Sequence, residues 1–336
     1  MFERVFKLSE HKTTVKTEVM AGITTFMTMA YILAVNPSVL GSTGMDTTAV
    51  LLATALASCL GTLCMAFMAN LPFALSAGMG LNAFMAYTVV AGYGYSWQVA
   101  LLAVFIEGLL FIVLSLTNVR EAIFNAIPLT LKKGVSVGIG LFIAFIGLQN
   151  SGLCVDSATL VGIISFPENF HTAGICALLT LIGLFFTAVF YTRKMKGAIL
   201  YGILLTWILG MLCQVTGLYV PTPDAGFYPL FPSWGMTDLS KLGLTFGQCF
   251  NVDFSAVGIV NFIVVIFSFL FVDIFDTLGT LIGVATKAKM LDKDGKLPGI
   301  KPALLADSIA TSAGAILGTS TTTTFVESAS GVAVGG

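Results

Sequence analysis

Long runs without charge alternate with short polar segments along the whole chain. No charged residue occurs between Asp46 and Glu107, and only Asp273 and Asp276 are charged between 256 and 286. A helix needs about 20 apolar residues to cross a bilayer. The pattern therefore predicts about ten membrane spans, at 19–40, 49–70, 74–91, 97–118, 130–149, 172–191, 197–217, 256–279, 302–316 and 319–336.

The composition supports a membrane protein. Hydrophobic residues make up 57% of the chain and charged residues 10%, whereas soluble domains carry about 25% charged residues. Mean hydropathy is +0.96. A net charge of −1 argues against a nucleic-acid partner. The six cysteines show no CxxC spacing, so neither a metal site nor a cofactor is predicted. We expect an all-α polytopic protein in the lipid bilayer.

The basic residues indicate an orientation. When the predicted loops are assigned alternately to two faces, every Lys and Arg except Lys241 falls on one face. Positive loops stay in the cytoplasm. The pattern therefore predicts a cytoplasmic N-terminal tail at 1–18 and a multi-pass protein of the cell membrane. The residues on the cytoplasmic face are Arg4, Lys7, Lys12, Lys16, Arg120, Lys132, Lys133, Arg193, Lys194, Lys196, Lys287, Lys289, Lys293, Lys296 and Lys301.

Two spans are irregular in the same way. The third contains Ser-Ala-Gly-Met-Gly-Leu-Asn at 76–82, and the tenth contains Gly-Thr-Ser followed by four threonines at 318–324. Non-helical backbone at membrane depth is tolerated only inside protein or beside water. Matched interruptions in two halves indicate an inverted-repeat transporter with substrate held near the midplane. The alternative is close helix packing through small residues.

Asp273 and Asp276 are three residues apart, so on a helix they share a face. Carboxylates in a membrane span usually line a cavity and handle protons, ions or polar substrates. No Lys or Arg occurs in these spans to neutralise them, so protonation is the simplest compensation for burial. A proton taken up with substrate could then be released inside.

Four stretches carry a family resemblance. They are GITTFMTMAYI at 22–32 with the following Asn36-Pro37, AGMGLNAF at 77–84, FVDIFDTLGTL at 271–281, and 321–331 around Glu327. With these motifs the chain resembles the xanthine/uracil permease family, in its adenine/guanine/hypoxanthine branch. The resemblance runs over the whole chain. It implies a secondary active transporter that imports purine nucleobases by proton symport, and not an enzyme.

The family has fourteen spans in two inverted seven-span repeats, divided into a substrate-binding core domain and a gate domain. The resemblance implies core segments at 19–118 and 256–336, gate spans at 130–217 and an extracellular loop at 218–255. The chain would then stop around the tenth span, so we expect a C-terminally truncated fragment. A homodimer is left open.

A purine edge offers N–H donors and ring-nitrogen or carbonyl acceptors, which suit carboxylate and amide partners. By resemblance, the expected substrate-binding residues are Asp276, Asp273, Glu327, Asn82, Gly80, Phe325 and Thr324. The expected proton-coupling residues are Asp276, Asp273, Glu327 and Glu107.

Several alternatives stay open. Spacing does not decide whether Asp273 or Asp276 contacts substrate, and Asn82 and Glu107 also suit hydrogen bonding between helices. Asp307 in the ninth span receives no role. The same fold would suit uracil or xanthine as substrate and Na⁺ as the coupled ion. An intramembrane aspartyl protease is disfavoured, because both aspartates lie on one span without its Tyr-Asp and Gly-x-Gly-Asp motifs.

Overall fold

The computed structural model describes residues 2–11, 13–117, 119–158, 160–195, 197–232, 235, 237–254, 257–293 and 297–336. Some sequence predictions fall outside the described residues. These are the boundaries at 118, 255 and 256, the loop residues Lys12, Lys196 and Lys296, and the side chains of Arg4, Arg120, Lys132 and Lys133.

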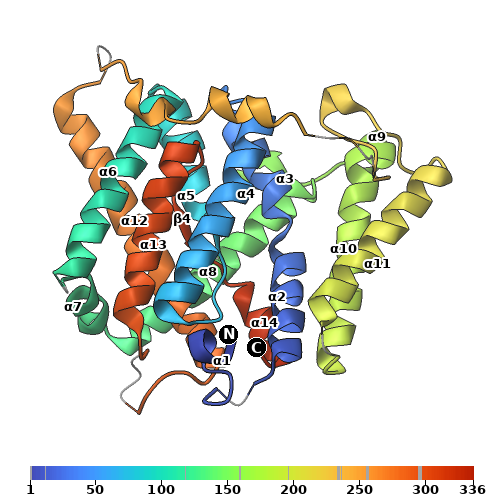
Figure 1. The fold of residues 1–336 in the computed structure, drawn as a ribbon. Helices are drawn as coiled ribbons and strands as arrows, with labels where there is room; N and C mark the ends of the chain where they lie inside the picture. Colours follow the sequence, from blue (N-terminus) through green and yellow to red (C-terminus); the bar gives the residue numbers. More distant parts are fainter. Residues whose placement is uncertain are drawn as a thin grey trace. The chain divides into compact units, whose positions relative to one another are not determined.

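The described chain is mostly helical, with four short strands (Figure 1). The α-helices are α1 Phe2–Phe6, α2 Val15–Met29, α3 Ile32–Gly41, α4 Thr47–Cys64, α5 Met79–Ala83, α6 Trp97–Leu116, α7 Val119–Ala126, α8 Leu129–Asn150, α9 Phe166–Asn169, α10 Ile175–Thr192, α11 Ala198–Val215, α12 Ile259–Lys287, α13 Ile300–Leu317 and α14 Ser328–Val334. The strands are β1 Leu75–Ala77, β2 Cys154–Ser157, β3 Leu160–Ile163 and β4 Thr322–Thr324. Short π- and 3₁₀-helical segments are η1 Met65–Ala69, η2 Phe84–Gly92, η3 Phe170–Gly174, η4 Pro223–Ala225, η5 Leu239–Leu244 and η6 Gln248–Phe250.

Seven helices among the described residues are long and apolar enough to cross a membrane. They are Val15–Gly41, Thr47–Ala69, Trp97–Leu116, Phe166–Thr192, Ala198–Val215, Ile259–Lys287 and Ile300–Leu317. The shorter apolar helices Met79–Gly92 and Gly140–Asn150 overlap the predicted third and fifth spans. The predicted tenth span is interrupted by β4, and α14 follows it.

Some boundaries differ from the sequence prediction. Helix α12 continues beyond the predicted end at 279 to Lys287, because the intervening residues are uncharged and continue the apolar pattern. The predicted loop at 218–255 contains η4, η5 and η6. The linker after α8 forms a β2–β3 hairpin, in which Cys154 pairs with Ile163 and Ser157 with Leu160. These elements lack the long charge-free runs on which the span prediction depends.

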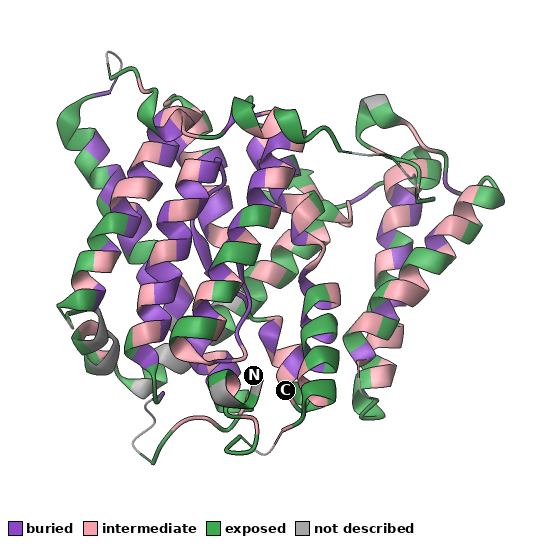
Figure 2. Cartoon of the chain, in the orientation of Figure 1, coloured by how far each residue is buried: buried purple, intermediate pink, exposed green. Residues whose placement is uncertain are grey.

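The chain divides into two compact units, Met1–Ile139 with Thr237–Gly336, and Gly140–Met236. In the first unit, α13 is the most enclosed of the long helices, because 67% of its residues are buried (Figure 2). Its small side chains allow close neighbours, since a Cβ on Gly61 of α4 would lie 2.9 Å from Ala310 Cβ. Gly108 of α6 similarly lies against Ser312. This packing of small residues is typical of membrane helices.

In the second unit, α10 and α11 form an antiparallel pair with reciprocal glycine–threonine contacts. Gly183 lies against Thr206, and Gly202 lies against Thr187. Only 17% of the residues of α11 are buried, and the others are partly buried or exposed. An apolar cluster of Ile175, Leu179 and Tyr219 closes one end of the pair.

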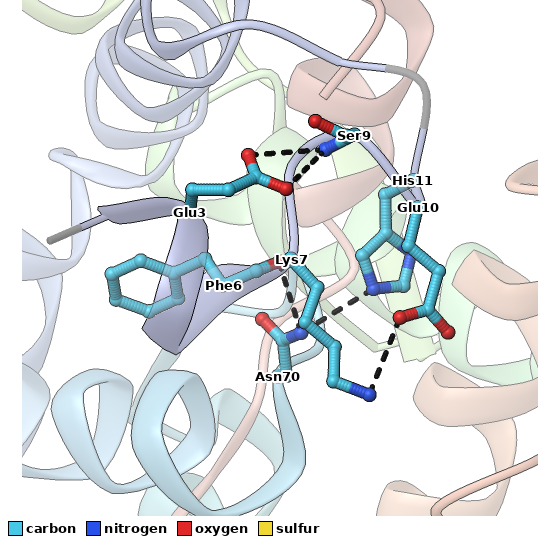
Figure 3. Close-up of polar contacts among 7 residues, drawn as sticks. All are labelled: Glu3, Phe6, Lys7, Ser9, Glu10, His11 and Asn70. Carbon is cyan, nitrogen blue, oxygen red and sulfur yellow. Dashed lines mark hydrogen bonds and ion pairs between the residues drawn. The ribbon is translucent and has the colours of Figure 1, made fainter.

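The N-terminal segment of the first unit folds back against Asn70 at the end of η1 (Figure 3). Glu3 accepts hydrogen bonds from the backbone N–H of Ser9 at 3.1 and 3.2 Å. Asn70 ends η1 in the left-handed conformation with φ 51°, and its Nδ2 donates to the carbonyl of Phe6 at 3.3 Å. His11 Nε2 lies 3.3 Å from the same nitrogen. The segment therefore packs against the turn that leads into β1.

Candidate functional site

The two irregular spans meet as a pair of antiparallel strands. Leu75 pairs with Thr324, Ser76 with Thr323 and Ala77 with Thr322. The ladder is extended by bonds from Gly78 N to Thr321 O at 3.0 Å and from Phe325 N to Ala74 O at 2.9 Å. Backbone groups inside a membrane protein need internal partners. Each broken span thus supplies the hydrogen bonds that the other lacks.

A helix begins within a few residues of the end of each strand. Helix α5 starts at Met79 after Gly78, and α14 starts at Ser328 after Glu327. The hydroxyl of Ser328 accepts a hydrogen bond from Ala74 N at 2.9 Å, so the start of α14 is tied to the segment before β1. Glu327 is thereby held next to the strand pair and stays partly accessible.

Asp276 of α12 lies beside the same strand pair. A Cβ on Gly78 would lie 3.3 Å from Asp276 Oδ2 and 2.7 Å from Thr323 Cγ2, so the glycine leaves room for the carboxyl group. Asp276 is partly accessible. Asp307 and Glu327 are the acids that act on it electrostatically. Two acidic groups, Asp276 of α12 and Glu327 at the residue before α14, therefore lie in one neighbourhood.

Asp273, one turn earlier on α12, is in a different environment. It is fully buried, and Thr277 Oγ1 lies 3.1 Å from its Oδ1. The same hydroxyl lies 3.2 Å from Asp307 Oδ2 of α13 and 3.2 Å from Thr323 Oγ1 of β4. A hydroxyl has one proton to donate, so Thr277 can donate to only one of the two carboxyl groups at a time.

Glu107 of α6 is also fully buried. Thr321 donates a hydrogen bond to its Oε2 at 3.2 Å, and Thr321 O in turn accepts the bond from Gly78 N. The acid therefore contacts the strand pair from α6. Thr321 contacts the acid on α6 directly, whereas Thr323 of the same segment contacts Thr277, whose hydroxyl lies beside the acids on α12 and α13.

Asn82 has both ends of its amide engaged. Its Nδ2 donates to Asn36 Oδ1 at 2.7 Å, and its Oδ1 accepts from the hydroxyl of Ser320. Asn36 in turn donates to Thr54 Oγ1 at 2.7 Å and to Thr319 Oγ1 at 2.8 Å. The cluster is buried. It joins α3, α4, α5 and the segment before β4, as expected for a hydrogen-bonding residue between helices.

The remaining predicted residues are placed around the strands. Gly80 is partly accessible in the first turn of α5. Thr324 is buried in β4, and Phe325 packs in an apolar cluster with Met29, Ile32 and Ala74. Among the predicted substrate-binding residues, Asp276, Glu327 and Gly80 are partly accessible, whereas Asp273, Asn82, Thr324 and Phe325 are buried (Figure 2 shows burial along the ribbon).

Within the described part of the chain, no group of three or more His, Cys, Asp and Glu residues could hold a metal ion. The six cysteines do not form disulfides.

Sequence reasoning missed several residues of this region. Asn36, Thr277 and Asp307 complete the buried clusters, and Tyr31 donates to Glu327 Oε1 at 2.6 Å. Each has a weak signal in the sequence, because it is a polar residue within an apolar span. The signal does not identify the partners, which come from distant spans.

Comparison with known proteins agrees with this architecture. Residues 16–336 match the model of the Permease family, Xan_ur_permease. The chain is 42% identical over 340 residues to adenine permease AdeP of Escherichia coli, covering 100% of this chain and 71% of AdeP. It is 44% identical over 335 residues to guanine/hypoxanthine permease PbuO of Bacillus subtilis, covering 99% of this chain and 73% of PbuO.

A solved structure supports the fold. The transmembrane domain of the cyanobacterial bicarbonate transporter BicA superposes with a TM-score of 0.53 at 15% identity, covering 96% of this chain and 78% of that domain. At this identity the likeness concerns the fold alone. The prediction of a mostly helical, multi-span transporter fold is confirmed. The sequence matches, which run along nearly the whole of this chain, show that it is a membrane transporter, not an enzyme, and that it belongs to the xanthine/uracil permease family of nucleobase permeases.

Proposed function

We propose that the protein imports purine nucleobases, namely adenine, guanine or hypoxanthine, by proton symport. The observation that carries the proposal is the pair of partly accessible acids, Asp276 and Glu327, beside the crossing strands. The names of AdeP and PbuO support purines as the substrate class. A purine edge presents ring N–H donors, and carboxylates are acceptors that bind N–H groups strongly.

The residues around the two acids suit a flat, polar-edged ligand. Gly80 has no side chain, so a base can approach the backbone of α5 closely. Phe325 and Met79 belong to the apolar cluster next to Glu327, and such surfaces favour the ring faces. Binding sites of this kind combine apolar walls with a few placed polar groups.

The buried residues have a supporting part in this proposal. Asn82 accepts a hydrogen bond from the Ser320 hydroxyl, and Thr324 pairs with Leu75 in the β1–β4 ladder. Both residues therefore position the backbone around the site. Asp273 lies behind Asp276 on α12 and shares Thr277 with Asp307. These contacts favour Asp276 over Asp273 as the acid that touches substrate.

The coupled proton resides on these acids. Two carboxylates in one low-dielectric site repel each other, so one proton on Asp276 or Glu327 removes a large electrostatic penalty. Asp273 and Glu107 extend the proton-binding set, connected to the strand pair through Thr277 and Thr321. The proton would enter with the base and leave with it on the cytoplasmic side.

In this proposal, the protein lies in the cell membrane and its N-terminus is in the cytoplasm. Segments 19–118 and 256–336 form the substrate-binding core, 130–217 belongs to the gate, and 218–255 is extracellular. Support comes from the location of all the acids described above within one compact unit, Met1–Ile139 with Thr237–Gly336. The basic residues support the orientation through the positive-inside rule.

The test is uptake of labelled hypoxanthine by cells that express the protein and lack their own purine permeases. We expect unlabelled adenine and guanine to compete, uracil to have little effect, and a protonophore to abolish accumulation. Competition mainly by uracil would reject purines as the substrate class. Uptake that survives the protonophore but needs Na⁺ would reject proton coupling.

The same assay tests the site. Glu327→Gln removes the carboxylate with little change in volume, so we expect uptake to fall about 10- to 100-fold, because a charge-assisted hydrogen bond contributes about 1.5–3 kcal/mol. The matched control is Glu168→Gln, an exposed acid in α9, which should leave uptake unchanged. Normal uptake by Glu327→Gln at equal membrane levels would remove Glu327 from the site.

A further inference from the structure

Tyr31 lies at a break in the first span. Helix α2 ends at Met29 and α3 begins at Ile32. At the junction, Leu33 N bonds to Ala30 O at 3.1 Å and Ala34 N bonds to Tyr31 O at 3.0 Å, so the bonds span three residues instead of four. The first span is therefore interrupted, like the two spans that contain β1 and β4. Tyr31 is a partly accessible residue at the interruption of the first span.

The side chain of Tyr31 reaches the start of α14. Its hydroxyl donates to Glu327 Oε1 at 2.6 Å, and Met79 Sδ at the start of α5 lies 3.6 Å from the same hydroxyl oxygen. A separation of 2.5–2.7 Å is typical of a hydroxyl bonded to a carboxylate. Tyr31 thus connects the break in the first span to the N-terminal ends of α5 and α14, the helices that follow β1 and β4.

Close packing between α2 and α14 holds this contact in place. Thr28 and Ser330 hydroxyls lie 2.8 Å apart. Gly331 lies so close to α2 that an added Cβ would be 2.8 Å from Ala21 O and would overlap Thr25. Because the two helices are fixed against each other by small residues, the Tyr31–Glu327 bond follows from the backbone arrangement.

We infer that Tyr31 is a positioning residue for Glu327 and a determinant of purine affinity, an inference that rests on the proposed function. A carboxylate has about four lone-pair sites. Tyr31 occupies one of them on Oε1 and so orients the group, which leaves Oε2 for a ring N–H of the base. The Tyr31 ring belongs to the same apolar cluster as Phe325 and Met79, and this cluster provides a surface for the face of the purine.

The test compares Tyr31→Phe with Tyr87→Phe. Both remove only a hydroxyl, and Tyr87 is an exposed control at 57%. We expect Tyr31→Phe to raise the apparent KM for adenine and hypoxanthine about tenfold, the value of one hydrogen bond to a charged group. Vmax should change by less than about twofold, because the hydroxyl acts on binding. Tyr87→Phe should change neither constant. An unchanged KM for Tyr31→Phe would overturn the inference.

A double-mutant cycle separates positioning from mere packing. Glu327→Asp keeps the charge but shortens the side chain, which withdraws the carboxylate from Tyr31. If Tyr31 acts through Glu327, adding Tyr31→Phe to Glu327→Asp should raise KM by less than about twofold. A full further tenfold increase would show that Tyr31 acts independently of Glu327 and would reject the proposed role.

Two controls keep the outcomes distinct. Binding of labelled hypoxanthine to purified folded protein replaces uptake if a variant inserts poorly, and an unchanged affinity of Tyr31→Phe there also rejects the inference. Failure of the unmodified protein to take up purines, or normal uptake by Glu327→Gln, would instead reject the proposed function. Loss of binding by Glu327→Gln with unchanged affinity in Tyr31→Phe would reject only the role of Tyr31.

Discussion

Asp273 and Asp276 lie one turn apart on α12 but in different surroundings. Asp273 is fully buried against Thr277, whose hydroxyl also reaches Asp307 and Thr323. Asp276 is partly accessible beside Gly78, where the absence of a side chain makes room for it. One helix therefore presents one acid to the protein interior and another to the neighbourhood of Glu327.

The difference separates two residues to which the sequence analysis assigned the same roles, substrate binding and proton coupling. A buried acid bonded to hydroxyl groups ties helices together, and removing one partner of such a cluster leaves a buried polar group unsatisfied. An accessible acid can exchange a water or a ligand without disturbing the packing. We therefore expect substitutions in the two groups to affect different measurements.

The largest expected effect is on substrate affinity. Asp276→Asn should weaken purine binding to the purified protein about 10- to 100-fold, because it removes a charged acceptor worth about 1.5–3 kcal/mol. Its thermal stability should stay nearly unchanged, and Asp156→Asn, at an exposed position of β2, is the control. Normal binding by Asp276→Asn combined with lost binding by Asp273→Asn would reverse the comparison.

The next effect is on stability. Thr277→Val keeps the shape of the side chain but removes the hydroxyl shared by Asp273 and Asp307, and we expect a loss of about 1–3 kcal/mol. The measurement is the thermal midpoint of the purified protein, with KM expected to stay within about threefold. Thr286→Val is the control, since Thr286 is at an exposed position and its hydroxyl donates to Ile282 O within the same helix. A large rise in KM with unchanged stability would show that Thr277 acts on substrate binding, as proposed for Asp276, and not on stability.

The smallest effect concerns an acid outside the predicted spans. Asp46 caps α4 by accepting from Ala49 N at 2.9 Å, and it forms an ion pair with Lys241 at 3.4 Å. The Ala49 N–H, and secondarily Lys241, hold the pKa of Asp46 below its usual value. Asp46→Asn keeps a capping side chain, so we expect a loss of less than about 0.5 kcal/mol at neutral pH.

The pH dependence of this effect has a defined sign. The folded pKa of Asp46 is lower than the unfolded one, so its contribution is complete at neutral pH. It is lost as pH falls below the ordinary Asp value of about 4 and through the lowered folded value. Thermal midpoints of the protein and of Asp46→Asn should therefore converge in acid. A difference that persists or grows there would contradict this account.

Much of the fold could be predicted from the sequence because its signals are local. Charge-free runs gave the positions of the long helices, and the glycines at 78 and 80 and the threonines at 321–324 marked the interruptions. The acids were identified for the same reason, since a carboxylate within an apolar run needs an explanation. Their roles remain predictions.

The contacts between spans could not be predicted from local signals. Strands of three residues, such as β1 and β4, have no periodicity that identifies a partner. The three-residue spacing of Asp273 and Asp276 shows that they share a face but not which neighbour each one meets. Asn82 was expected near substrate, and only the positions of Asn36 and Ser320 show that its amide is engaged.

The pairing of β1 with β4 also constrains how the chain is made. Leu75 is synthesised early and Thr324 near the end of the described sequence. Until β4 is synthesised, the peptide groups of β1 have no partner strand, and the hydrocarbon core of the bilayer offers them no hydrogen bonds. The third span must therefore stay in contact with water or with the insertion machinery while the spans between β1 and β4 enter the membrane. Final assembly of the third span therefore follows the insertion of these spans and depends on the arrival of β4.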